Sequence, residues 1–233
     1  MKFPHNEKYN AQFDQIPNLV WYPYVGQDFE HNSQRIMVFA HNIPMPPERY
    51  EFERNARTAK TTWTGALDEF TYEQESYTKT FRYFIKAATG LTEDFGKGSN
   101  TSNTDKVDTF VRRIAYANFI QGLVKSANAL TMADSDAIAL SQAINHQIIE
   151  MLGITHCICW GKPVFEYVTT SLGFNVREDE YLNKRGFAYR LNENKNGHRM
   201  HVLKTFHPSM PGFGYKDSRT QNILSDFLSK ENP

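Results

Sequence analysis

Short apolar runs, separated by polar stretches rich in glycine, proline and asparagine, recur along the chain. Their length and their content of β-branched and aromatic residues predict buried strands. The longest runs lie at residues 35 to 40, 113 to 121, 154 to 160 and 201 to 206. Apolar residues also recur at helical spacing from Asp134 to Leu152, which predicts a helix that ends at Gly153. Strand, helix, strand order favours parallel pairing through crossover helices. We therefore predict a three-layer α/β fold with a central, mostly parallel sheet flanked by helices.

The remaining pattern predicts the elements around that sheet. Helices are predicted at residues 71 to 89, 163 to 172 and 218 to 229. The apolar runs at 187 to 191 and 201 to 206 flank the turn-prone stretch NENKNGH, which predicts a hairpin. Residues 92 to 105 are rich in glycine, serine and asparagine and predict an exposed loop, and residues 1 to 34 predict an irregular entry segment.

Composition narrows the class of protein. The 233 residues are expected to form a single domain, residues 1–233, with a substantial core. Lysine plus arginine equals aspartate plus glutamate at 26 each, so no overall positive field indicates a nucleic-acid partner, although a local basic face is compatible with this total. The N-terminal residues lack an apolar signal region, and no run approaches the roughly 18 apolar residues of a membrane span. We expect a soluble cytoplasmic protein with no membrane partner.

Candidate chemistry lies where predicted strands end. Pro208 cannot donate to a sheet, so the strand before it stops near His207, and an imidazole and the Ser209 hydroxyl follow directly. Asn42 follows another strand, in a loop stiffened by prolines, and Asn118 is an amide inside an apolar run that must find a hydrogen-bond partner. Ligands of open α/β sheets bind at the carboxyl ends of strands. The alternative is that these residues only build turns or satisfy the backbone.

Four segments taken together resemble the uracil-DNA glycosylase-like superfamily. They are RIMVFAHNIP at residues 35 to 44, AYANFIQ at 115 to 121, CICWGKPVFEYV at 157 to 168 and HVLKTFHPS at 201 to 209. Their order and spacing cover most of the chain. The resemblance implies a uracil-DNA glycosylase-like fold, DNA or a nucleobase-containing ligand as partner, and a role in DNA repair.

The resemblance also implies roles for individual residues. Asn42 would orient the attacking water, Asn118 would recognise the base, His207 would hydrogen-bond the leaving base, and Ser209 would contact a phosphate. The chain departs from the family pattern because no aspartate or glutamate stands between Arg35 and Pro47. An amide is not a strong general base, so the departure weakens the expectation of fast hydrolysis.

The expected activity is hydrolysis of the N-glycosidic bond of a damaged base in DNA. The base would first leave the stack, and Tyr50 or Trp63 would cover its face. No cofactor and no metal are expected. The first alternative is a binding module of the same fold, weakly active or inactive. A Ser209–His207 hydrolase is a weaker one, because no serine elbow is visible.

A metal centre built from three histidines is the weakest alternative. Its ligands would be His41, His201 and His207. Two of them, His201 and His207, would lie about 20 Å apart on an extended strand, which is too far to share one ion. The two cysteines, Cys157 and Cys159, alternate in an apolar run and are expected to be buried small hydrophobes.

Overall fold

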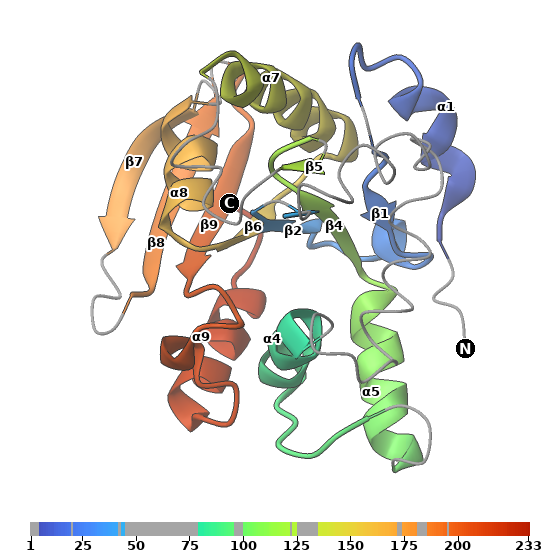
Figure 1. Ribbon diagram of the computed structural model, residues 1–233, viewed down its shortest axis with the longest axis vertical. Coiled ribbons are helices and arrows are strands. Elements are labelled where there is room, and N and C mark those ends of the chain that lie inside the picture. Colours follow the sequence, from blue (N-terminus) through green and yellow to red (C-terminus); the bar gives the residue numbers. More distant parts are fainter. Residues whose placement is uncertain are drawn as a thin grey trace.

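The computed structural model describes residues 5–19, 21–41, 43–44, 79–95, 100–121, 123–124, 135–171, 174–180, 186–194 and 196–233. These residues form an α/β fold around a seven-stranded sheet with the strand order β1-β4-β2-β6-β9-β8-β7 (Figure 1). Its strands are β1 (Tyr24–Val25), β2 (Ile36–Ala40), β4 (Ile114–Asn118), β6 (His156–Trp160), β7 (Phe174–Glu180), β8 (Ala188–Asn194) and β9 (Arg199–Thr205). A separate parallel pair joins β3 (Ile43–Pro44) and β5 (Leu123–Val124).

The four central strands β4, β2, β6 and β9 are parallel, as the strand-helix-strand order predicted. The sheet as a whole is mixed, because β1 runs antiparallel to β4, and β8 and β7 continue the sheet beyond β9 in antiparallel pairs. The expectation of a mostly parallel sheet is therefore wrong for its two sides. The reason on one side is the predicted hairpin, which is confirmed: a short turn joins β8 to β9 and allows only antiparallel pairing.

Helices cover both faces of the sheet and complete the three layers (Figure 1). The α7 side carries α7 (Ser135–Leu152) and α8 (Lys162–Glu166), which continues as a π-helical turn, Tyr167–Ser171. The α4 side carries α4 (Lys79–Thr89), α5 (Thr101–Val111) and α9 (Ser218–Leu228). Alternate strand residues face opposite layers, so Phe39 packs on the α7 side and Val38 on the α4 side. None of the helices in the described ranges has the length and apolar character that a membrane crossing requires.

The predicted helices at the end of the chain and before β6 are confirmed as α9 and α7, and α4 occupies the last part of the helix predicted at 71 to 89. The loop predicted at 92 to 105 is wrong in its last part, because α5 begins at Thr101. The Asn100 side chain accepts a hydrogen bond from the Ser102 amide at 2.9 Å and caps that helix. Asparagine and serine favour both loops and helix caps, so their composition alone does not separate the two.

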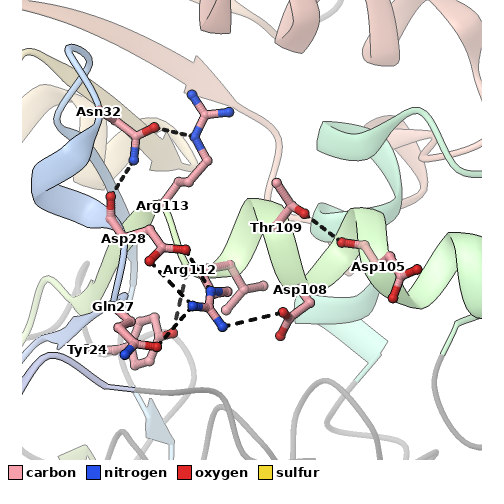
Figure 2. Close-up of polar contacts among 10 residues, drawn as sticks. Tyr24, Gln27, Asp28, Asn32, Asp105, Asp108, Thr109, Arg112 and Arg113 are labelled. Atoms are coloured by element: carbon pink, nitrogen blue, oxygen red, sulfur yellow. Dashed lines mark hydrogen bonds and ion pairs between the residues drawn. The ribbon is translucent and has the colours of Figure 1, made fainter.

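The entry segment is more ordered than predicted. It contains the short helices η1 (Glu7–Tyr9), α1 (Asn10–Phe13) and η2 (Phe29–His31), besides strand β1. Arg112, directly after α5, fastens this segment: its Nε donates to Asp28 at 2.7 Å and its Nη2 to Gln27 at 3.0 Å (Figure 2). Arg113 donates to Asn32 at 2.6 Å. These contacts hold the entry segment against the start of β4.

Candidate functional site

The candidate site lies at the carboxyl ends of the four parallel strands. Asn118 is the last residue of β4, Trp160 is the last residue of β6, and His41 directly follows β2. Asn118 lies opposite Ala40 in register. The backbone pairing continues one step further, because the Ile120 amide donates to the His41 carbonyl at 3.1 Å. Since parallel strands end at one edge of a sheet, groups that are distant in the chain meet there.

Three buried nitrogens at this edge have no hydrogen-bond partner among the described residues. They are Nε2 of His41, Nδ2 of Asn118 and Nε1 of Trp160. The side chains of Asn118 and Trp160 are almost fully buried, at 3% and 2% exposed. A buried polar nitrogen without a partner lowers the free energy of unfolding by about 1–3 kcal/mol. Three of them at one edge therefore destabilise the free protein considerably. Such groups are the ones that a polar ligand satisfies.

His207 lies beside Trp160, two residues beyond the end of β9. Its ring meets the Trp160 indole edge-on, with the ring centroids 5.9 Å apart. Its Nδ1 is 2.7 Å from the Ser209 hydroxyl and 3.4 Å from the Ser209 amide, which can only donate. Nδ1 is therefore the acceptor, and the proton of the neutral ring is on Nε2. Burial lowers the pKa of His207, which favours this neutral form.

His41 also lies at this edge, although the sequence pattern did not assign it to the base site. Burial, and then the nearby His207, lower the pKa of His41 from 6.5 to about 4. Two neutral imidazoles therefore lie at the same edge at neutral pH. The sequence signal that could have identified His41 is its position between the first predicted strand and Asn42.

Trp160 was expected only as part of an apolar strand, and it does pack in the core. Its ring contacts Phe84 at 5.2 Å, Tyr116 at 5.6 Å and Phe81 at 6.0 Å between ring centroids. Its indole nitrogen nevertheless belongs to the unsatisfied group at the strand ends. The tryptophan is therefore a core residue with one unsatisfied polar atom at the strand ends.

Of the residues predicted for the site, Asn118, His207 and Ser209 lie at this edge. Asn42, Tyr50 and Trp63 lie outside the described residues. His201 lies toward the opposite end of the sheet, where its ring contacts Tyr189 and the Glu231 carbonyl. The structure therefore does not bring together the three histidines of the metal alternative.

The described residues contain no group of three or more histidine, cysteine, aspartate or glutamate side chains arranged to hold a metal ion. Ser209 and His207 are in contact, as a hydrolase pair would be, but they are two residues apart and form a local turn. In the described part of the chain no carboxylate contacts the His207 ring, so the third member of a triad is missing from it.

Comparison with known proteins adds no identification: no protein-family model and no curated protein matches this chain.

Proposed function

We propose that this chain is a uracil-DNA glycosylase-like protein that takes an extruded nucleobase at the carboxyl ends of β4, β2, β6 and β9. The observation that carries the proposal is the set of unsatisfied nitrogens of His41, Asn118 and Trp160, next to the His207 imidazole. Nucleobases offer carbonyl oxygens and ring nitrogens along one edge and an apolar face. The polar groups at the strand ends suit the edge of a base, and the neighbouring Trp160 and His207 rings suit its face.

The proposed reaction is hydrolysis of an N-glycosidic bond. The water oxygen bonds to the anomeric carbon as the bond from that carbon to the base nitrogen breaks. The electron pair leaves with the base, and the proton that the water loses ends on the released base. Negative charge develops on the base, and the Nε2–H of His207 donates to a base oxygen and stabilises it. A neutral imidazole is suited to this role, and burial lowers the pKa of His207 in that direction.

His41 takes the role of the missing carboxylate, which is to orient the attacking water. Its pKa of about 4 is near that of an ordinary aspartate, so its ring is neutral at neutral pH and keeps one nitrogen that can accept a hydrogen bond from water. We assign it, with Asn42, to the orientation of the attacking water. The absence of an acidic side chain from residues 35 to 47 remains the specific observation that favours the second candidate function, a base-binding module without hydrolysis.

Met210 supports a nucleic-acid partner for the site. It follows Ser209 directly, and its side chain is 55% exposed, one of two large apolar side chains exposed in the described residues. Proteins that unstack DNA insert apolar side chains between bases. We assign Met210 to the gap that the extruded base leaves.

The test is base release from a labelled oligonucleotide with one uracil, single- and double-stranded, at low salt. Wild type, His207→Ala and the matched control His31→Ala, which replaces an exposed histidine outside the site, are compared. Loss of the donor is expected to slow release by about 100-fold or more. The His31→Ala variant is expected to match wild type.

Each outcome decides between the candidates. Release that falls only in His207→Ala supports the glycosylase. Saturable binding of the oligonucleotide without release, weakened by His207→Ala, supports the binding module. Absence of both release and binding overturns both functions.

A further inference from the structure

A second polar site lies on the other face of the sheet, beneath α8. A cavity of about 240 Å³ is lined there by Lys162, Glu166, Arg190 and Lys204, with Phe165 and Ala188 as apolar wall. In Figure 1, α8 lies over the part of the sheet formed by β8 and β9. The cavity is not part of the candidate site described above.

The alternation along β9 separates the two sites. Val202 packs with the α7 side of the sheet and Leu203 with the α4 side, so Lys204 points to the α7 side. Trp160 packs with the α4 side. Lys204 lies opposite Cys159 in register, close to the carboxyl ends of both strands. The cavity and the Trp160 site are therefore near the same edge but on opposite faces.

The charges around Lys204 are unbalanced. Among the described lining residues, three side chains are cationic and one is acidic. The acidic one, Glu166, pairs with Lys162 at 3.4 Å, and both side chains of that pair are largely exposed. Lys204 itself makes no hydrogen bond or ion pair with the described residues. Burial, and then the positive charge of Lys162, lower the pKa of Lys204, although the charge of Glu166 acts in the opposite direction.

Arg190 forms one wall and is held by other contacts. It donates to the Thr169 hydroxyl at 2.9 Å, and its guanidinium lies over the Phe165 ring at 5.0 Å. Lys204, and not Arg190, is therefore the cation in this cavity that remains for a ligand, and Lys162 has only its exposed pair with Glu166.

We infer that this cavity binds a phosphate group, with the Lys204 ammonium as its main contact and Lys162 at its mouth. A phosphate dianion accepts several charge-assisted hydrogen bonds, and ammonium groups are common phosphate ligands. The cavity is large enough for a phosphoryl group with part of what it is attached to. The source of the phosphate is either a free nucleotide or the backbone of a nucleic acid. The inference does not depend on the proposed base site.

Titration calorimetry with inorganic phosphate and pyrophosphate tests the site in the full chain. Wild type, Lys204→Met and Lys162→Met are compared with Lys106→Met, which removes the same charge from an exposed position of α5. Pyrophosphate is expected to bind wild type and Lys106→Met alike, and to bind Lys204→Met about tenfold or more weakly. The Lys162 side chain is 73% exposed, so its replacement is expected to leave the fold intact. A smaller loss is expected there.

Absence of saturable binding, or equal loss in Lys106→Met, overturns the inference. Two further ligands then separate the sources. If Lys204→Met weakens a mononucleotide but not a uracil-free oligonucleotide, the ligand is a free phosphate compound. If it weakens the oligonucleotide and lowers the salt dependence of its binding, the ligand is a backbone phosphate. The two proposals fail separately. Failure of Lys204→Met to bind phosphate does not affect the proposed function if base release is unchanged, and loss of base release in His207→Ala does not affect the phosphate site.

Discussion

The two ends of the parallel strands β4, β2, β6 and β9 differ in whether their buried side-chain nitrogens have partners. At the amino end, His156 and His201 lie side by side with ring centroids 5.0 Å apart, and both are fully partnered. His156 contacts Thr155 at 2.9 Å and the Lys230 carbonyl at 3.2 Å, and His201 contacts Tyr189 at 2.5 Å and the Glu231 carbonyl at 3.0 Å. At the carboxyl end, nitrogens of His41, Asn118 and Trp160 have no partner among the described residues.

This difference separates groups that hold the fold together from groups that are available to a ligand. The amino-end histidines attach the C-terminal residues to the sheet, and they gain stability by doing so. The unpartnered nitrogens at the carboxyl end lower the stability of the free protein. Such groups persist where a bound ligand supplies the missing hydrogen bonds. Replacing equivalent residues at the two ends tests the comparison.

The largest effect is expected from acid. Burial, and then His201, lower the pKa of His156 from 6.5 to about 4. Between these values the unfolded chain binds a proton that the folded chain does not, so the contribution of His156 is complete above about pH 6.5 and is lost as the pH falls toward 4. The loss approaches about 3 kcal/mol in the free energy of unfolding. Denaturant unfolding measured from pH 7 to pH 4 checks it.

His41 has a similarly low pKa and makes the matched variant. Both His156→Gln and His41→Gln are expected to flatten the acid dependence. Only His156→Gln is expected to lower stability at pH 7, because it disturbs the contacts to Thr155 and Lys230. An equal loss at pH 7 in both variants contradicts the comparison.

The next effect is at His201. His201→Ala removes the hydrogen bonds to the Tyr189 hydroxyl and the Glu231 carbonyl and is expected to cost about 2–3 kcal/mol. Tyr189→Phe, which removes one hydrogen bond and keeps the ring, is expected to cost less. Urea unfolding at pH 7 measures both. A His201→Ala variant as stable as wild type means that the C-terminal residues are not anchored through this ring.

Two buried asparagines give a smaller and more specific contrast. Asn145 donates from Nδ2 to the Phe119 carbonyl at 2.7 Å, although its Oδ1 has no partner among the described residues, whereas Nδ2 of Asn118 has none. We expect Asn145→Ala to be less stable than Asn118→Ala by about 1 kcal/mol or more. Base binding is expected to show the reverse order, with Asn118→Ala the weaker binder. Thermal unfolding of both variants measures the order of their stabilities, and oligonucleotide binding measures the order of their affinities.

The smallest effect is expected at the attachment of the entry segment. Hydrogen bonding to Arg112 lowers the pKa of Asp28, so the pair contributes stability at neutral pH and loses it as the pH falls through that lowered pKa. The pair is partly exposed, and Asp28→Asn is expected to cost about 1 kcal/mol or less at low salt. The cost is expected to shrink in high salt. A large, salt-independent loss indicates a packing defect.

The sequence determined the elements and the parallel core of this protein. Apolar runs identified β2, β4, β6 and β9, and the helical period identified α7, because burial imposes these patterns on any chain that folds in this way. Pro208 marked the end of β9 and therefore the position of His207. Local composition did not separate a loop from a capped helix at Asn100. It predicted the antiparallel hairpin of β8 and β9 but not the antiparallel strands β1 and β7.

Only the tertiary structure decided which polar groups are satisfied. His41, His156, His201 and His207 are the same residue type in similar apolar surroundings of the sequence. Whether a ring meets the chain's own carbonyls or lies unpartnered at a strand end depends on segments far away in the chain, such as Lys230 beside His156. Hydrogen-bond satisfaction is a property of three-dimensional neighbours, and the sequence pattern carries only burial.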